Sequence, residues 1–192
     1  MFQPLPQSFY NRPTLTVARE LLGTRLVHML NGVRLAGIIL ETEAYIGESD
    51  LACHAKAGRT ARTAIMYGPP GRAYVYFTYG MHWLLNAVTE AENSPAAVLI
   101  RAIQPLEGID TISTRRHGRG TDGPAKLTLA LGIDGTQNGL DLCDPASGLW
   151  IEPGHPIPEK SVTIGPRVGL NSVPEPWKSM PWRFIVNPNQ RA

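Results

Sequence analysis

The dipeptide Asn31-Gly32 constrains the fold of this chain more than any other feature, because it lies between two runs of β-prone residues. Asparagine and glycine both tolerate positive φ, and two consecutive positive φ angles are what the tightest β-hairpin turn requires. The flanking runs, residues 24–30 and 33–45, each have the length of a strand or more. The sequence therefore predicts an antiparallel hairpin in the first quarter of the chain.

Further β-prone segments follow one another closely. Residues 73–79, 81–88 and 97–103 predict three strands of an antiparallel meander, with Gly80 turning the chain between the first two. Residues 47–70 mix Gly, Ala, Arg and Thr without a clear period, and we expect a loop with one helical turn. Loops of that length often carry function.

Three segments have the pattern of short helices: residues 15–22, 106–116 and 123–131. The candidate caps and stops are Thr14 or Thr16 and Gly23 for the first helix, and Asp122 with Pro124 for the third. Nine of the 17 prolines follow residue 140, so we expect loops and short strands there, such as residues 183–186. Strands and helices together predict an α+β fold.

Length and composition indicate one domain over residues 1–192, since domains typically have roughly 100 to 150 residues. Hydrophobic residues make up 43% and charged residues 18%, which is typical of globular chains. We find no apolar run of about 18 residues, and residues 1–6 lack the regions of a signal peptide. We therefore expect a cytoplasmic protein. Cys53 and Cys143 cannot build a disulfide framework, and the net charge of +2 permits nucleic-acid binding without indicating it.

The second run contains the series Glu41-Thr42-Glu43-Ala44-Tyr45. Side chains alternate along a strand, so both acids and the tyrosine share one face. Glu43 on such a face is a candidate general base that deprotonates water. The simpler interpretation is an acid that is solvated or paired with a cation, and the pattern alone favours it.

The rings of Tyr45 and His54 are nine residues apart across a predicted bend, where they can form opposite walls of a slot for a planar ligand. A buried tyrosine and a hydrogen-bonded core histidine is the simpler interpretation. A zinc site at His54 is rejected, because the adjacent Cys53 has no Cys-x-x-Cys partner.

A second aromatic series runs from Tyr74 to Tyr79. Most of it is typical of a core strand, with Tyr74 and Tyr76 facing one way and Val75 the other. Tyr79 is different, because it precedes Gly80 at the predicted hairpin tip, where a large ring projects into solvent. A DNA duplex accepts such an apolar wedge between its base steps. Wedge, slot and acid together are typical of an enzyme that extrudes a nucleotide.

These features resemble the alkyladenine (3-methyladenine) DNA glycosylase family, bacterial branch, along nearly the whole chain. The resemblance depends on the order and spacing of several short motifs: residues 41–45 with His54, residues 74–81, Asn86, residues 99–102, residues 123–127, and Arg167-Val168-Gly169. It implies a curved antiparallel sheet with flanking helices and a protruding β-hairpin that enters the minor groove of DNA. It also implies monofunctional hydrolysis without a metal or cofactor.

The resemblance implies a role for each matching residue. Glu43, and not Glu41, matches the general base, Arg101 a residue that helps hold the attacking water, and Val168 a backbone carbonyl that touches this water. The base-binding positions are Tyr45, His54 and Tyr76, with Asn86 excluding normal guanine by a clash with its exocyclic amine. Tyr79 matches the intercalating wedge. The implied substrates are 3-methyladenine, 7-methylguanine, hypoxanthine and ethenoadenine in double-stranded DNA, acted on by a monomer.

One segment departs from the family pattern, which usually reads Arg-Thr-Pro-Arg-Asn after the pocket histidine. Here Ala61 and Thr63 replace the proline and the asparagine, and we expect a looser loop with altered contacts.

Two other functions compete with the glycosylase. A base deaminase needs a zinc-binding set of His and Cys residues that the sequence lacks. A lesion-sensing module without catalysis needs only Tyr79 and the basic cluster Arg115, Arg116 and Arg119. That cluster is most simply a solvated face, and contact with DNA phosphates is the lesser alternative.

Overall fold

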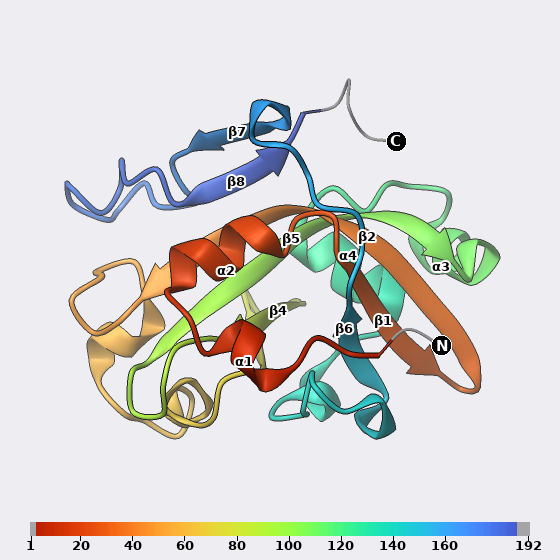
Figure 1. Ribbon diagram of the computed structural model, residues 1–192, viewed down its shortest axis with the longest axis horizontal. Helices are drawn as coiled ribbons and strands as arrows, with labels where there is room; N and C mark the ends of the chain where they lie inside the picture. The colour runs from red at the N-terminus through yellow and green to blue at the C-terminus, as the bar shows by residue number, and fades with distance from the viewer. Residues whose placement is uncertain (1–2, 188–192) are drawn as a thin grey trace.

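The structure is a computed structural model that describes residues 3–187 and has an antiparallel sheet at its centre (Figure 1). Six strands have the order β3-β4-β5-β2-β1-β6, and β8 pairs with both β2 and β7. The strands are β1 (Arg25–Leu30), β2 (Val33–Ile46), β3 (Ala73–Thr78), β4 (His82–Val88), β5 (Ala96–Glu107), β6 (Leu149–Glu152), β7 (Val162–Gly165) and β8 (Arg183–Val186). The expected α+β fold is confirmed.

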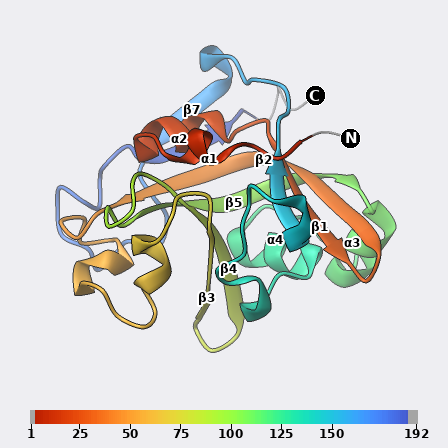
Figure 2. The same ribbon diagram turned by 60° about the horizontal axis from the view of Figure 1, so that its bottom comes forward.

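Short helices cover both faces of this sheet. They are α1 (Gln7–Tyr10), α2 (Thr14–Glu20), α3 (Ile109–Arg116) and α4 (Pro124–Leu131), with 3-10 helices η1 (His54–Ala57), η2 (Ala64–Tyr67), η3 (Gly135–Gln137), η4 (Pro145–Ser147) and η5 (Glu159–Ser161). Helix α2 packs against β2 and β5, and α4 packs against β4 and β5 from the opposite face (Figures 1 and 2). The segment 47–70 contains two 3-10 helices, one more helical turn than we expected.

The two predicted hairpins are present. Asn31 and Gly32 have φ of 50° and 79°, so both positions of the turn between β1 and β2 use positive φ. Tyr79 and Gly80 have φ of 51° and 66° at the tip of the β3-β4 hairpin. This second hairpin extends away from the body of the protein, as Figure 2 shows at its lower edge. Positive φ is uncommon for a residue other than glycine, so the backbone of Tyr79 has an unusual conformation at this tip.

The residues predicted as N-caps are wrong. The N-cap of α2 is Pro13, and the hydroxyl of Thr14 donates instead to the Glu90 carboxylate at 2.5 Å. Thr16 lies exposed within the helix. Gly123 is the N-cap of α4, with Pro124 in its first turn as expected. Asp122 accepts a hydrogen bond from Lys126 Nζ at 3.0 Å and does not cap the helix. The Thr14 hydroxyl thus has a distant partner that the local pattern does not reveal, whereas the partner of Asp122 is only four residues away along the chain.

Strand β5 is longer than predicted. It continues through Pro105 to Glu107, and α3 begins only at Ile109. Pro105 pairs with Gly37 next to a register shift, where a missing backbone donor is tolerated. The strand predicted for residues 97–103 was therefore too short, and the helix predicted from residue 106 begins later.

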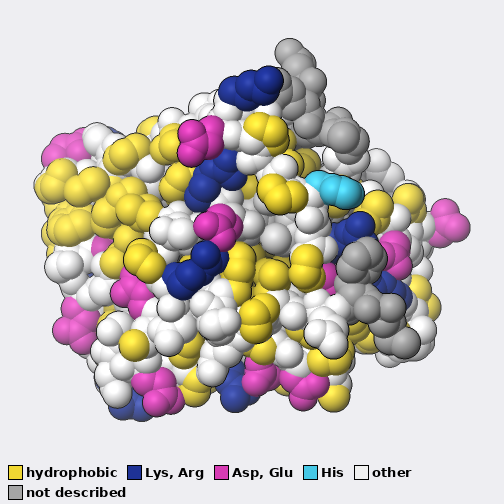
Figure 3. Space-filling model, in the orientation of Figure 1, with side chains coloured by type: hydrophobic (Ala, Val, Ile, Leu, Met, Phe, Trp, Pro, Cys, Tyr) yellow, Lys and Arg dark blue, Asp and Glu magenta, His cyan; other side chains and the backbone are white. Residues whose placement is uncertain are grey.

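The core lies against the inner positions of the central strands, and its fully buried side chains include Leu26, Leu35, Ile39, Val98 and Ile100. On the face shown in Figure 3, the Lys and Arg side chains lie apart from one another among acidic and apolar ones. The small net charge is thus not concentrated on this face.

Candidate active site

Strand β2 places Glu43 deep in the protein. The first half of β2 pairs with β1, whereas Glu41–Glu43 pair with β8, and β5 runs along the other edge. The Thr42 hydroxyl donates to the Ala18 carbonyl of α2, so its neighbours point to the opposite face of the sheet. Glu43 is 0% exposed there. The predicted alternation of Glu41, Glu43 and Tyr45 against Thr42 is confirmed.

Three donors surround the Glu43 carboxylate. The Tyr45 hydroxyl donates to Oε2 at 2.7 Å, the backbone N–H of Val168 donates to Oε1 at 2.7 Å, and Arg101 Nη1 lies 3.3 Å from Oε1. Burial raises the pKa of Glu43 above the ordinary glutamate value, and Arg101, Val168 and Tyr45 oppose this rise. Burial also holds the pKa of Tyr45 well above its usual value, so its hydroxyl stays a donor. The result is a buried acid with a raised proton affinity.

A pair of β-bulges aims Arg101 at this acid. The register between β2 and β5 shifts on either side of Glu41, and Arg101 is the extra residue on β5. Bulges re-aim side chains near active sites. Arg101 Nε donates to Glu41 Oε1 at 2.8 Å, and Arg183 Nη1 lies 3.5 Å from the same oxygen. Glu41 therefore anchors Arg101 rather than repeating the position of Glu43.

A cavity of about 330 Å³ opens on this face of the sheet. Its size lies at the lower end of the roughly 300 to 1,000 Å³ typical of small-molecule sites. Among the residues that line it are all but one of the predicted site residues: Tyr45, His54, Tyr76, Tyr79, Asn86, Arg101 and Val168. The exception is Glu43, which lies directly behind the wall formed by Tyr45, Arg101 and Val168. The structure thus brings the predicted set together.

His54 begins η1 and faces the tyrosines of β3. Its Nδ1 forms a 2.9 Å hydrogen bond with the Tyr74 hydroxyl, and its ring meets the Tyr76 ring edge to face, with centroids 4.5 Å apart. Burial, with Arg62 and Lys56, lowers the pKa of His54 to about 4. The imidazole is therefore neutral at neutral pH and adds no positive charge to the cavity.

Asn86 lies deep in the cavity wall, whereas Tyr79 lies at the cavity rim. Asn86 is 4% exposed, and its Nδ2 donates to the Tyr74 carbonyl at 3.0 Å, which fixes the amide in the wall. Tyr79 is 83% exposed at the rim, on the hairpin tip. The expectation of a ring projecting into solvent is confirmed, although Tyr79 itself lies just beyond the end of β3.

The loop that departs from the family pattern keeps its own internal contacts. Thr63 is 2% exposed, and its hydroxyl donates to the Gly58 carbonyl at 2.8 Å and accepts from the Thr60 N–H at 2.8 Å. The neighbouring Arg62 guanidinium lies over the Tyr76 ring, 5.0 Å from its centroid. The hydroxyl of Thr63 therefore closes this turn through two backbone contacts, while the looser loop expected from Ala61 and Thr63 stays a prediction.

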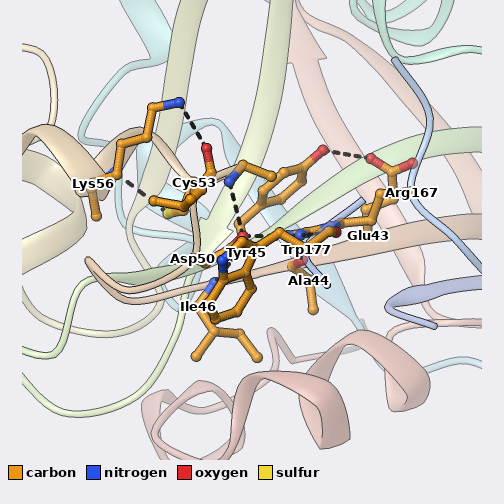
Figure 4. Close-up of polar contacts among 12 residues, drawn as sticks. Glu43, Ala44, Tyr45, Ile46, Asp50, Cys53, Lys56, Arg167 and Trp177 are labelled. Atoms are coloured by element: carbon orange, nitrogen blue, oxygen red, sulfur yellow. Dashed lines mark hydrogen bonds and ion pairs between the residues drawn. The ribbon is translucent and has the colours of Figure 1, made fainter. Parts of the chain in front are cut away.

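Sequence reasoning missed one buried ion pair, between Asp50 and Arg167. Figure 4 shows the pair beside Glu43 and Tyr45. Arg167 Nη1 and Nη2 lie 2.5 and 2.9 Å from the two Asp50 oxygens, and both side chains are fully buried. The two residues are 117 positions apart, so no local period links them. The only sequence signal was that Arg167 belongs to the motif Arg167-Val168-Gly169, on which the family resemblance partly depends.

The basic cluster lies away from this cavity. Arg115 and Arg116 line a second groove, beside Lys126 and the β4 end of the hairpin. Their guanidinium Nε atoms donate to the Leu129 and Gly120 carbonyls. In residues 3–187 no group of three His, Cys, Asp or Glu side chains is placed to share a metal ion, and none of the helices described there is long and apolar enough to cross a membrane.

The whole chain resembles DNA glycosylases. A family model described as methylpurine-DNA glycosylase (MPG) matches residues 8–190. A relative from Myxococcus xanthus, named "Putative 3-methyladenine DNA glycosylase", is 50% identical over 188 residues, which cover 98% of this chain and 92% of the relative. Relatives with the same name from Carboxydothermus hydrogenoformans and Methanocella arvoryzae are 47% and 50% identical, covering 97% and 94% of this chain and 96% and 90% of their own.

These matches show the class of the protein, which is a DNA glycosylase. Such an enzyme is a hydrolase of DNA repair and its substrate is DNA. More particularly, the chain belongs to the methylpurine-DNA glycosylase family.

Proposed function

We propose that this protein is a monofunctional glycosylase that flips damaged purines out of duplex DNA and hydrolyses their N-glycosidic bond. The observation that carries the proposal is the buried Glu43 carboxylate directly behind a cavity of about 330 Å³ with aromatic side chains in its walls. Tyr45, His54 and Tyr76 supply the walls that stack on the extruded base. Asn86, fixed by its hydrogen bond to Tyr74, limits what fits at the exocyclic edge.

The proposed chemistry uses water as nucleophile. The glycosidic bond breaks with its electron pair leaving on the base, and positive charge develops on the sugar. Ionised Glu43 stabilises that charge and takes a proton from the water whose oxygen bonds to C1′. Arg101 and the backbone of Val168 hold the water in line. In the free protein Val168 donates its N–H to Glu43, a contact that complements the carbonyl role implied by the resemblance.

The proposed substrates are 3-methyladenine, 7-methylguanine, hypoxanthine and ethenoadenine. The first two are cationic, which favours both stacking on tyrosine faces and departure as neutral leaving groups. A neutral His54 does not repel them. Hypoxanthine and ethenoadenine are uncharged, and their weak pairing makes extrusion less costly.

The proposed wedge is Tyr79. Its exposed ring at the tip of the protruding hairpin suits entry into the minor groove, where it takes the place of the flipped nucleotide. The proposed partner is double-stranded DNA containing damaged bases, bound by one copy of the chain at the nucleoid in the cytoplasm.

The direct test measures free base released from an oligonucleotide containing hypoxanthine. Wild type should release it, and Glu43→Gln should abolish release while leaving lesion binding measurable. Glu48→Gln is the matched control, because Glu48 also accepts a hydrogen bond from a tyrosine hydroxyl, but its partner Tyr67 does not line the cavity, whereas Tyr45, the partner of Glu43, does. Full activity in Glu43→Gln contradicts the base assignment. Lesion binding by wild type without base release favours the lesion-sensing module, and a borohydride-trapped covalent adduct contradicts hydrolysis.

A further inference from the structure

Besides its ion pair with Asp50, Arg167 contacts several groups near Glu43, the candidate general base. Its Nη1 donates to the Ala44 carbonyl at 3.0 Å, on the strand residue between Glu43 and Tyr45. Its Nη2 donates to the Trp177 carbonyl at 3.1 Å. Its guanidinium lies over the Tyr45 ring, 4.7 Å from the centroid, and over the Trp182 ring at 4.8 Å. One planar cation therefore touches three separate segments of the chain.

Asp50 connects this cation to the segment that leads to His54. Its Oδ1 accepts from the Ala52 N–H at 3.0 Å, and its Oδ2 accepts from the Ile46 N–H at 3.3 Å, where β2 ends. The carboxylate thus folds the chain between Tyr45 and η1 into a fixed turn (Figure 4). The two walls of the cavity are joined through one side chain.

We propose that the Asp50–Arg167 ion pair is a positioning device for base excision, which holds the Tyr45 ring against the cavity and the Val168 N–H on Glu43. The proposal rests on the function proposed above and assigns roles to two residues that touch no substrate. Arg167 precedes Val168 in the chain, so fixing its guanidinium between β2 and the Trp177 carbonyl also fixes the adjacent amide. Tyr45 has the cation on one ring face and the cavity beside it.

The chemistry of the pair supports positioning over stability. Replacement of a buried ion pair by apolar residues is often neutral or stabilising, so such a pair is weak evidence of a stabilising role. The planar fork of arginine, in contrast, satisfies a bidentate carboxylate, carbonyls and ring stacking at once, which lysine cannot do. A group that must hold two rings and a backbone amide in register needs that geometry.

The test is Arg167→Lys, which keeps the positive charge and removes the planar guanidinium. We expect the single-turnover excision rate to fall by about 100-fold, the loss typical of a roughly 1 Å displacement at a reacting centre, with lesion binding little changed. The acid limb of the rate against pH should move to higher pH, because Glu43 loses part of the Val168 hydrogen bond that favours its ionised form. Glu43 is also faced by Tyr45 and Glu41 from β2 and by Arg101 from β5, and all three are retained.

The matched control is Arg34→Lys. Arg34 also makes a bidentate pair, with Glu152 at 3.2 and 2.8 Å, and lies over a ring, that of Trp150, but at the other end of β2. It should lose stability without a change in rate or pH profile. Asp50→Asn is the second variant, and circular dichroism establishes the folded fraction of each, so that rates are compared per folded molecule.

Wild-type rate and an unmoved acid limb in either folded variant overturn the positioning role. Loss of folding in both variants, with Arg34→Lys folded, also overturns it, because the pair is then structural. Neither result affects the proposed function, which fails separately if wild type releases no base.

Discussion

The hydroxyl of Tyr45 offers the sharpest test of how this cavity activates its acid. Tyr45→Phe removes one oxygen and leaves the ring in the cavity wall. The hydroxyl donates to Glu43 Oε2 at 2.7 Å, so the variant removes one of the donors that favour the ionised carboxylate. The pKa of Glu43, already raised by burial, should therefore rise further.

The size of this rise follows from the energy of the bond. A hydrogen bond to a charged group contributes about 1.5 to 3 kcal/mol, and one pKa unit corresponds to about 1.4 kcal/mol, so the pKa should rise by roughly 1 to 2 units. A general base acts only when ionised, so activity is lost as pH falls through the pKa of Glu43. At a pH below the pKa of Glu43 in both proteins, Tyr45→Phe should be about 10- to 100-fold slower than wild type. At a pH well above both pKa values, it should approach the wild-type rate.

The assay is single-turnover excision of hypoxanthine across a pH series. Tyr67→Phe is the control, because it removes a tyrosine hydroxyl that donates to a different carboxylate, Glu48, at 2.5 Å. The control should keep the wild-type acid limb. An unmoved limb in Tyr45→Phe, or a loss of rate equal at every pH, refutes the reasoning that this hydroxyl tunes Glu43.

Further predictions concern the wedge, the anchor and the filter. Tyr79→Ser should weaken flipping, seen as a smaller fluorescence change of 2-aminopurine beside a lesion, and an unchanged signal removes the wedge. Glu41→Gln releases Arg101 from a 2.8 Å partner and removes a charge that raises the pKa of Glu43, so the rate should fall while the acid limb moves to lower pH. An acid limb that stays or rises contradicts that role. Asn86→Ala should increase release of normal guanine relative to hypoxanthine, and an unchanged ratio in a base-release panel argues against the filter.

The local parts of this fold were predictable because each depends on neighbours in the chain. Asn31-Gly32 specifies its hairpin through backbone angles, and alternation on β2 placed Glu41 and Glu43 on one face. Alternation cannot separate the two acids. Their difference lies in depth, since the side chain of Glu41 is 16% exposed and pairs with Arg183, whereas that of Glu43 is 0% exposed. Only Glu43 accepts the Val168 N–H, which comes from a segment 125 residues away along the chain.

The remaining parts depend on contacts that no period encodes. The bulge that aims Arg101 is a property of two strands in register, and the Asp50–Arg167 pair joins segments that meet only in the folded chain. The predicted cap at Thr14 failed for the same reason, because its hydroxyl donates to Glu90, which lies 76 residues away along the chain. Such partners are chosen by tertiary packing, which outweighs the local preference.

The central claim is that the cavity beside Glu43 receives a base extruded from DNA. A crystal structure of Glu43→Gln bound to a duplex containing hypoxanthine tests it most directly. The account predicts the hypoxanthine ring between Tyr45 and His54, with Tyr79 filling its former place in the duplex. A bound duplex whose hypoxanthine remains stacked, or lies outside this cavity, contradicts the claim.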